Sequence, residues 1–353
     1  MGIIYGAPLA IGGKKPSQLN VTTNGTWSKL EGYSPVNVNI PASAVTAGTI
    51  TISNNGLTNV IEYQNANVSI PASAVTSGTM TITADGNYDV TNFKSVKVII
   101  GNFAFTSPID GLSYANGLPN DWNRIKEIAK IISEASGSIN ANTTGSIYVN
   151  KGNTWAYKIT PGDTINVTSQ IGTYTYAVMG FNNFALTNRG NYGGTHTTAG
   201  LTFGAVNCVG KYKMNSSNTN SGGWGTCLMR TSTMPTLQNG MPGTLAQVKV
   251  PYVDYNNQST ILYSDDYMFL PAEKEVFESI LGSPTAEANA LTQFAYYKNG
   301  GSKTKYFSGS KVWWWLRSVL YYGDYAFCAV ATSGNTGDYG AKGSIGAAPC
   351  FCV

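Results

Sequence analysis

The last stretch of the chain, Lys311 to Val353, alternates between apolar segments and polar loops. Its apolar segments are Trp313–Ser318, Phe327–Val330 and Ala347–Val353, and each has the length of a buried strand. The sequence between them is rich in Tyr, Gly, Ser, Asn and Asp. Because apolar strands must be covered by other parts of the chain, this stretch must cross the core of a domain repeatedly. We therefore predict three core strands joined by two loops that reach the surface.

The composition of these loops is that of a binding surface. Tyrosines provide large, rigid contact area at a low cost in conformational entropy, and Gly, Ser, Asn and Asp provide adaptable hydrogen bonds, as in antibody paratopes. The same residue types are also typical of ordinary turns in β-proteins. Composition alone therefore leaves both interpretations open.

Separate motifs, in a fixed order along roughly residues 102 to 353, carry a resemblance to a known family. They are W-W-L-R-S at 314–318, F-C-x-V at 327–330, Gly334 and G-x-x-P-x-F-x-V at 346–353, preceded by Gly180-Phe181-Asn182, Ser221-Gly222-Gly223-Trp224 with Met229-Arg230, and Leu270–Phe277. The chain resembles the variable proteins of diversity-generating retroelements, which are common in phages of gut bacteria. The resemblance implies a C-type lectin-like C-terminal domain that displays a hypervariable surface.

In that family, reverse transcription mutates the adenines of template codons that are mostly AAY. Codons ending in a pyrimidine cannot encode Trp, Met, Lys, Gln or Glu, and residues 319–346 contain none of these except Lys342. Lys342 is thus a departure, explained by an unvaried position or a different codon. Within a variable region of about 313–346, we expect the ligand-binding surface to comprise Val319, Leu320, Tyr321, Tyr322, Gly323, Asp324, Tyr325, Asn335, Thr336, Gly337, Asp338, Tyr339, Gly340, Ala341 and Ser344.

Residues 19–101 contain an internal repeat. The segment Pro41–Thr49 recurs as Pro71–Thr79, and alternating strands at 36–40 recur at 66–70 and 96–100. Turns at Asn24-Gly25, Asn55-Gly56 and Asp85-Gly86 are typical of two-residue β-hairpins. Such repeats resemble those of phage tail and baseplate proteins, which implies attachment and spacing.

The sequence therefore predicts an α+β chain in three parts. Residues 1–18 form an arm, residues 19–101 form small all-β repeats of Ig-like or hairpin type, and residues 102–353 form the C-type lectin-like domain. That domain should carry two helices on mixed sheets, and the helical patterns lie at 121–135 and 271–281. We expect Trp224 in the core and Arg317 as a buried cation bonded to carbonyl groups. The polar segment 284–310 is expected beside the variable loops.

Composition and charge narrow the classes of partner. The net charge is only +4, and Lys and Arg do not cluster, which disfavours nucleic acid. The N-terminus lacks the basic and apolar regions of a secretory signal, and no apolar run has the length of a membrane span. We therefore expect a protein made in the bacterial cytoplasm and located in the virion. Its expected partners are a host-cell surface protein or glycan and, through residues 1–101, other tail proteins, and a homo-oligomer is compatible with this.

Catalysis has little support in the sequence, and we expect no catalytic residue, metal or cofactor. His196 is the single histidine and, in a Gly/Thr loop, is expected at the surface. Asp265 and Asp266 are adjacent, so on a strand they point to opposite faces, which does not suit a glycosidase pair. The five cysteines are expected to be free and buried, including Cys350 and Cys352.

Two further features of lectin-like folds bear on the alternatives. The tripeptides Glu-Pro-Asn and Trp-Asn-Asp of calcium-dependent sugar binding do not occur. Formylglycine-generating enzymes share the broad fold but use reactive cysteines, which a buried terminal strand does not offer. A non-diversified structural protein of the tail or baseplate is the main alternative to a binder, and a glycan-active enzyme is a third interpretation.

Overall fold

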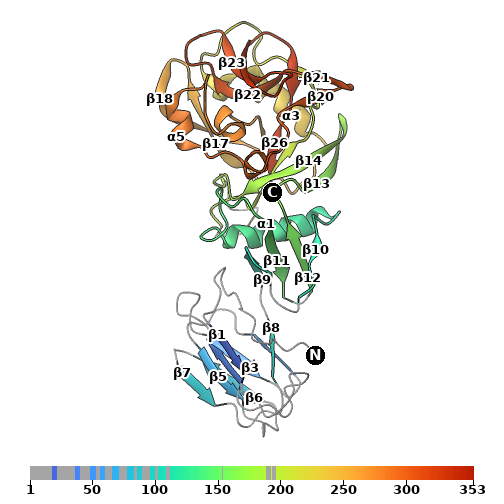
Figure 1. Ribbon diagram of the computed structural model, residues 1–353, viewed down its shortest axis with the longest axis vertical. Coiled ribbons are helices and arrows are strands. Elements are labelled where there is room, and N and C mark those ends of the chain that lie inside the picture. Colours follow the sequence, from blue (N-terminus) through green and yellow to red (C-terminus); the bar gives the residue numbers. More distant parts are fainter. Residues whose placement is uncertain are drawn as a thin grey trace. The chain divides into compact units, whose positions relative to one another are not determined.

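The computed structural model describes the strands between Gln18 and Ile99 and residues 102–108, 112–152, 154–187, 192 and 196–353. The chain forms two compact units (Figure 1). The first comprises Met1–Asn116 and Ile147–Ile159, and the second comprises Gly117–Ser146 and Thr160–Val353. The sequence placed residues 102–353 in one domain, whereas the sheet formed by strands within 102–116 and 147–159 falls in the first unit. The expected arm, apart from Gln18, lies outside the described residues.

The repeats of the first unit form strands at the expected places. A sheet of order β1-β2-β5-β7 contains β1 (Gln18–Val21), β2 (Val36–Asn39), β5 (Ala66–Ile70) and β7 (Gly86–Asp89). Two further pairs are β3 (Gly48–Ile52) with β6 (Gly78–Ile82), antiparallel, and β4 (Gly56–Asn59) with β8 (Val96–Ile99), parallel. The predicted hairpins at Asn55-Gly56 and Asp85-Gly86 are therefore wrong, because β3 and β6, equivalent strands of two repeats, pair with each other. The turn residues Asn55 and Asp85 themselves lie outside the described residues.

A second sheet of the first unit has the order β10-β12-β11-β9. Its strands are β9 (Asn102–Phe105), β10 (Ala115–Asn116), β11 (Ile147–Lys151) and β12 (Trp155–Ile159). The rings of Tyr114 and Tyr148 pack edge to face with centroids 5.1 Å apart.

The second unit begins with its longest helix, α1 (Trp122–Glu134). Asp121 caps it by accepting a hydrogen bond from the Asn123 N–H, and Ile125, Ile128 and Ile132 form its buried face. The Asn182 side chain donates to the carbonyls of Ile132 and Ile139 at 2.9 and 2.7 Å, which ties the helix end to the adjoining sheet. The helix predicted over 121–135 is confirmed.

One five-stranded sheet of the second unit has the order β13-β14-β15-β26-β19. It contains β13 (Thr164–Ser169), β14 (Gly172–Phe181), β15 (Leu201–Ala205), β26 (Cys350–Cys352) and β19 (Met268–Phe269). The last strand, β26, lies between β15 and β19, and Val353 exchanges both main-chain hydrogen bonds with Leu201.

The other five-stranded sheet has the order β16-β25-β22-β23-β24. It contains β16 (Gly210–Tyr212), β25 (Ile345–Ala347), β22 (Trp314–Val319), β23 (Ala326–Val330) and β24 (Thr336–Gly340). Two hairpins accompany the sheets: β17 (Val248–Asp254) with β18 (Asn257–Asp266), and β20 (Lys305–Phe307) with β21 (Ser310–Val312). Short helical turns are α2 (Gly223–Thr226), the π-helical η2 (Met229–Thr233), α3 (Met234–Gln238), α4 (Glu273–Val276), α5 (Thr285–Ala290) and α6 (Ala295–Lys298).

The helix predicted over 271–281 is wrong beyond Val276. Phe277 is extended, and the Val276 carbonyl accepts a hydrogen bond from the Gln293 side chain in place of a further helical turn. The carboxylate of Glu273 accepts the N–H groups of Gly282 and Ser283, so the chain folds back onto the start of α4. The Glu273 side chain thus binds N–H groups of the segment after α4, which favours a turn there over further helix.

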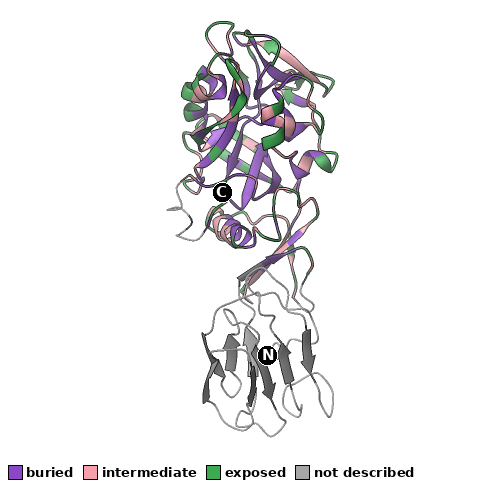
Figure 2. Ribbon diagram, turned by 90° about the vertical axis from the view of Figure 1, so that its left-hand side faces the viewer, coloured by how far each residue is buried: buried purple, intermediate pink, exposed green. Residues whose placement is uncertain are grey.

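The second unit is mixed α+β, with sheets predominating over a few short helices. Buried residues concentrate along its strands, as Figure 2 shows. Its largest fully buried side chains include Trp224, Trp314, Trp315 and Arg317, so the predicted core position of Trp224 is confirmed. Among the described residues, the helices are too short or too polar to cross a membrane.

Candidate functional site

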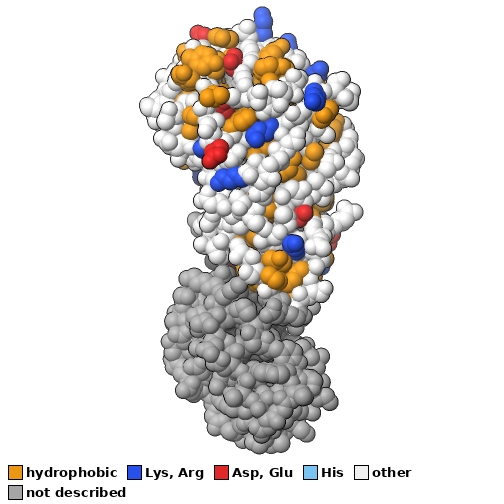
Figure 3. Space-filling model, in the orientation of Figure 1, with side chains coloured by type: hydrophobic (Ala, Val, Ile, Leu, Met, Phe, Trp, Pro, Cys, Tyr) orange, Lys and Arg blue, Asp and Glu red, His pale blue; other side chains and the backbone are white. Residues whose placement is uncertain are grey.

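The loop between β22 and β23 carries three exposed tyrosines. Tyr321, Tyr322 and Tyr325 expose 49%, 59% and 46% of their surface. The rings of Tyr321 and Tyr322 meet edge to face with centroids 4.8 Å apart, and the Tyr322 hydroxyl lies 3.3 Å from the Asp338 carboxylate on β24. These three tyrosines and Asp338, here called the tyrosine cluster, join the two predicted variable loops into one surface. The face of the second unit seen in Figure 3 shows apolar patches among largely uncharged atoms.

Tyr339 lies on the opposite face of β24 from Asp338, because successive side chains of a strand alternate. Its ring packs against those of Trp313 and Trp315, with both centroid distances 5.9 Å, and it remains 40% exposed. The residues predicted as one binding surface are therefore divided between two faces that share the edge formed by β24.

Some of the expected surface residues lie inside the protein. Val319, Leu320, Gly323 and Ala341 are buried, so their side chains cannot form part of a contact surface. The first two continue the apolar strand β22, and a Cβ atom on Gly323 would lie 2.8 Å from the Tyr325 ring. The expected residues that are exposed are Tyr321, Tyr322, Asp324, Tyr325, Asn335, Tyr339 and Ser344, and Thr336, Gly337, Asp338 and Gly340 are partly exposed.

Asn220 holds the tyrosine loop in place, and the sequence analysis did not identify it. Its buried side-chain amide donates to the carbonyls of Gly323 and Ala326, both at 2.7 Å, and lies 3.5 Å from that of Leu320. Its main-chain N–H donates to the carbonyl of Asp324 at 2.9 Å. The only sequence signal was its position directly before the Ser221–Trp224 motif. This single residue satisfies the inward-facing carbonyls of the loop, so the tyrosines project from a fixed backbone.

Tyr321 also forms one wall of an open groove. Its N–H donates to the Gly282 carbonyl at 2.8 Å, and its carbonyl accepts from the Gln258 side chain at 2.9 Å. The groove has a volume of about 760 Å³, and α5 contributes to its lining together with residues 280–284. Part of the segment 284–310 thus lies beside the variable loop, as the sequence predicted.

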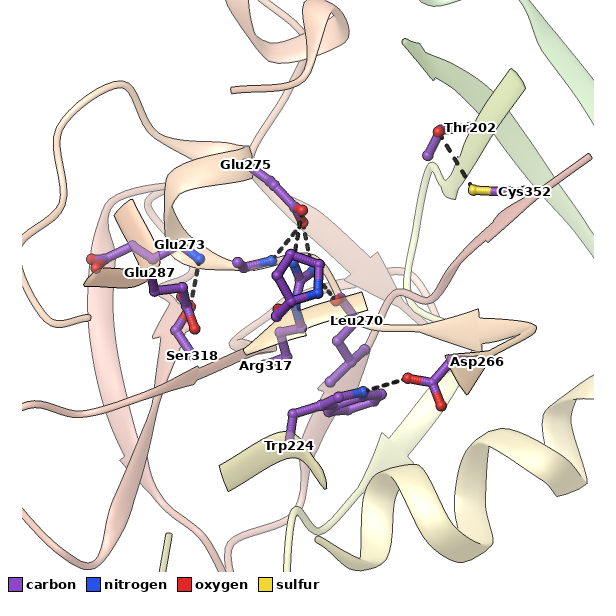
Figure 4. Close-up of polar contacts among 12 residues, drawn as sticks. Thr202, Trp224, Asp266, Leu270, Glu273, Glu275, Glu287, Arg317, Ser318 and Cys352 are labelled. Carbon is purple, nitrogen blue, oxygen red and sulfur yellow. Dashed lines mark hydrogen bonds and ion pairs between the residues drawn. The ribbon is translucent and has the colours of Figure 1, made fainter. Parts of the chain in front are cut away.

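Beneath the surface, Arg317 forms a buried ion pair (Figure 4). Its guanidinium donates to the carbonyls of Pro251 and Leu270 at 3.0 and 2.8 Å, as expected from the sequence. It also makes two bonds to the Glu275 carboxylate, at 2.6 and 2.7 Å, which sequence reasoning missed. Arg317 therefore joins β22 to β17, β19 and α4 behind the tyrosine loop.

Two more buried glutamates surround this pair. The Glu273 carboxylate accepts the Thr336 hydroxyl at 2.5 Å and the Ser283 N–H at 2.7 Å, which connects α4 to β24. Glu287 on α5 is hydrogen-bonded to the hydroxyl of Ser318, and that hydroxyl also accepts the Glu273 N–H. In this arrangement the Ser318 hydroxyl donates to the Glu287 carboxylate while accepting the Glu273 N–H. Burial raises the pKa of Glu287 to about 7, against the opposing effect of Arg317.

The carboxylates of Asp265 and Asp266 point to opposite faces of β18, as predicted. Asp265 is 48% exposed and accepts the Thr187 hydroxyl. Asp266 is buried and accepts the Trp224 indole N–H at 2.8 Å and the Arg230 side chain at 2.7 Å. Asp266 thus orients a core tryptophan, and the two carboxylates do not converge on a common space.

His196 is buried, which corrects the expectation of a surface histidine. It is 7% exposed, and its ring packs edge to face on Tyr192 with centroids 5.3 Å apart. Burial lowers its pKa, and its Nε2 lies 3.8 Å from the Glu134 carboxylate at the end of α1. A loop rich in Gly and Thr gave no sign that aromatic packing would cover it.

The five cysteines are free and buried, as predicted. Burial raises the pKa of Cys208, Cys227 and Cys352 to about 12, so their thiols stay protonated at neutral pH. In the described part of the chain, His, Cys, Asp and Glu side chains form no group of three or more arranged to hold a metal ion.

Comparison with known proteins gives one family match. Residues 205–353 match the model of a family described as a domain of unknown function, DUF6273. No curated protein and no solved structure matches the chain. The matched segment contains the tyrosine cluster, Asn220 and the Arg317–Glu275 pair, so the C-terminal part of this chain is similar to a domain of unknown function in the region that carries the candidate surface.

Proposed function

We propose that this chain is a phage protein that uses a diversified surface to bind targets on host cells. The observation that carries the proposal is the contrast between the exposed tyrosine cluster and the buried residues that hold it. Tyr321, Tyr322 and Tyr325 are exposed, while the buried Asn220 binds the backbone of their loop and the buried Arg317 anchors β22, the strand that leads into it.

This contrast suits a surface whose side chains change while its fold persists. The Gly323 and Ala326 carbonyls accept from Asn220, and the Tyr321 carbonyl accepts from Gln258. Both donors lie outside the loop, so substitution of the tyrosines leaves these bonds intact. A rigid loop loses little conformational entropy on binding, which favours affinity. The proposal assigns recognition to the exposed side chains and stability to the buried ones.

The motifs in the sequence support a C-type lectin-like scaffold for the second unit, in the manner of the variable proteins of diversity-generating retroelements. The mixed sheets, the helix α1 and the return of the terminal strand to the core are compatible with it. The repeated strands of the first unit suit attachment to tail proteins. The target is a host-cell surface protein or glycan, and the protein acts by binding, without catalysis.

Sequencing of the encoding locus across a phage population tests the diversification. We expect substitutions in the codons for the exposed residues, namely Tyr321, Tyr322, Asp324, Tyr325, Asn335, Tyr339 and Ser344. The codons for the buried Val319, Leu320, Gly323 and Ala341 should stay fixed despite lying within the same stretch. Uniform codons, or changes spread evenly over exposed and buried positions, would contradict the proposal and favour a structural tail or baseplate protein.

A binding assay tests the surface itself. Fluorescently labelled full-length chain is applied to a panel of gut bacterial isolates, alongside a variant with Tyr321, Tyr322 and Tyr325 changed to Ser. We expect the variant to lose binding to isolates that the unchanged chain labels. Tyr263→Ser is the matched control, because Tyr263 is 60% exposed on β18 outside the variable stretch. Equal labelling by the triple variant would refute the assignment of the surface.

A further inference from the structure

The strand β24 lies at the end of its sheet, beside β23. Two hydrogen bonds fix which backbone groups face β23: the Ala331 N–H donates to Asn335, and the Ala341 N–H donates to Tyr325. Hydrogen-bonded pairs alternate along an antiparallel ladder, so residues 335, 337, 339 and 341 bond to β23. The N–H and C=O groups of Thr336, Asp338 and Gly340 therefore point away from the sheet.

This outer edge is a row of main-chain groups available for pairing. Within the part of the chain that the structure describes, the N–H groups of Thr336, Asp338 and Gly340 and the carbonyls of the first two have no hydrogen-bond partner. The row ends where the Lys342 N–H donates to the Asn218 side chain and the Gly340 carbonyl accepts from Gly343. The strand thus offers alternate donors and acceptors over five residues.

Several of the usual protections of edge strands are missing from β24, whose one charged residue is Asp338. Natural sheets cover or interrupt such edges with prolines, lysines or bulges, because an open edge pairs with other chains. The sequence of β24, TGDYG, contains neither proline nor lysine, and its register with β23 runs without a shift. We propose that β24 receives an extended segment of the target protein as an added strand, which makes the target of the tyrosine surface a polypeptide.

The charge of β24 favours a target segment over a second copy of this chain. Asp338 is the central residue, so a two-fold pairing of β24 with itself over its full length would place two Asp338 side chains directly opposite each other. Like charges in that position destabilise a strand pair, whereas an opposite charge stabilises it. The partner residue opposite Asp338 is therefore Lys or Arg, near the Tyr322 hydroxyl that lies 3.3 Å from the same carboxylate.

The other face of β24 determines which residues the partner segment needs on either side of its basic residue. Gly337 of β24 lies against the Trp313 ring, because a Cβ atom added at Gly337 would lie 2.7 Å from that ring. Since Gly337 has no side chain, β24 does not cover this part of the ring. Tyr339 packs on the same indole. Partner side chains on either side of the basic residue point to this aromatic face. The partner segment thus has an apolar–basic–apolar pattern, with main-chain bonds giving affinity and alternate side chains giving specificity.

This inference rests on the proposed function for its biological role. Main-chain hydrogen bonds do not depend on which side chains β24 carries, so they persist while substitution of residues 335–344 changes the selectivity. Because the main-chain bonds stay constant while the side-chain contacts change, each new variant retains weak binding on which selection can act.

The test uses the full chain and a library of random 12-residue peptides displayed on yeast. We expect enriched peptides with the apolar–basic–apolar pattern, and about a tenfold or greater loss of affinity for Asp338→Pro, which removes an outward N–H without breaking the ladder to β23. Asp338→Ala keeps that N–H and should weaken binding less. Thr168→Pro is the matched control, because Thr168 occupies an equivalent outward position on β13, the edge of the other sheet.

N-methylation of each residue of an enriched peptide gives the decisive pattern. Methyl groups at alternate positions should abolish binding, and those between them should be tolerated. Failure to enrich peptides beyond the level of the Asp338→Pro chain, or an N-methyl profile without this alternation, overturns the proposal. So does a dimer in sedimentation that Asp338→Pro dissociates, because a second copy then occupies the edge. If peptides bind in this way but the locus is uniform, the proposed diversification fails and the edge site stands.

Discussion

Replacement of Arg317 by Met tests whether the buried frame depends on its ion pair. Arg317 is fully buried and provides two bonds to Glu275 and one each to the carbonyls of Pro251 and Leu270. Met has a similar length and apolar stem but cannot donate. Among the described residues, the substitution therefore leaves the buried Glu275 carboxylate with the Ala272 N–H as its one remaining hydrogen-bond donor, and it removes the donors of two carbonyls.

The expected loss of stability follows from these contacts. Removing one partner of a buried pair costs about 3–5 kcal/mol, and each carbonyl left unsatisfied adds about 1–3 kcal/mol. Since relaxation and water entry recover part of this, we expect the free energy of unfolding to fall by about 4 kcal/mol or more. Replacing both charges, as Arg317→Met with Glu275→Leu, removes the uncompensated charge and should recover about 2 kcal/mol relative to the single variant.

Urea unfolding followed by tryptophan fluorescence measures these differences, because Trp224, Trp314 and Trp315 are fully buried. Arg124→Met is the control, since Arg124 pairs with Glu127 on the exposed face of α1 and should cost at most about 1 kcal/mol. The reasoning is refuted if Arg317→Met costs no more than the control. It is also refuted if the double variant is destabilised by the sum of the two single changes.

Three further predictions concern the buried polar groups. The Glu287 carboxyl keeps its proton up to about pH 7 in the folded protein, whereas in the unfolded chain its pKa is near 4.5. This residue therefore makes the free energy of unfolding fall as the pH rises between these two values. Glu287→Gln should abolish that part of the decline, as measured by urea unfolding from pH 4 to 8. Asn220→Ala removes the donor to the carbonyls of Gly323 and Ala326 and should lower the free energy of unfolding by about 2–4 kcal/mol and speed amide exchange in the tyrosine loop; exchange as slow as in the unchanged chain would contradict the bracing role. The five cysteines should react with a thiol reagent only in denaturant, and rapid modification of the native protein would show that a thiol is accessible.

The local sequence pattern was sufficient to predict those helices and strands that are stabilised mainly by residues close in sequence. The helix α1 was predictable because apolar residues recur at helical spacing behind a capping aspartate, and most strands were predictable from alternation or apolar runs. The segment 271–281 failed because its backbone is bound by Glu273 and Gln293, and no helical pattern reveals such competition. The sequence likewise gave no means to foresee that His196 would be covered by Tyr192.

The candidate surface was predictable in outline but not residue by residue. Loop composition pointed to the exposed tyrosines, whereas Val319, Leu320, Gly323 and Ala341 were included because they fall in the same stretch of sequence. Their burial depends on packing from distant segments. Asn220 is 103 residues from the Gly323 carbonyl that it binds, and Glu275 is 42 residues from Arg317. A single sequence carries no record of such pairings.

The central position of the strand β26 has a consequence for biosynthesis. Thr202 in β15 meets Cys352 across 150 residues of sequence, so one side of β15 has no strand to pair with until residues 350–352 emerge from the ribosome. At a synthesis rate of about 5–20 residues per second, this interval lasts roughly 10–30 s. The proposed variable segment is translated within that interval, before the sheet closes. Any variant of that segment must therefore remain soluble as a nascent chain, so chaperone access and slow aggregation constrain which substitutions the proposed diversification can retain.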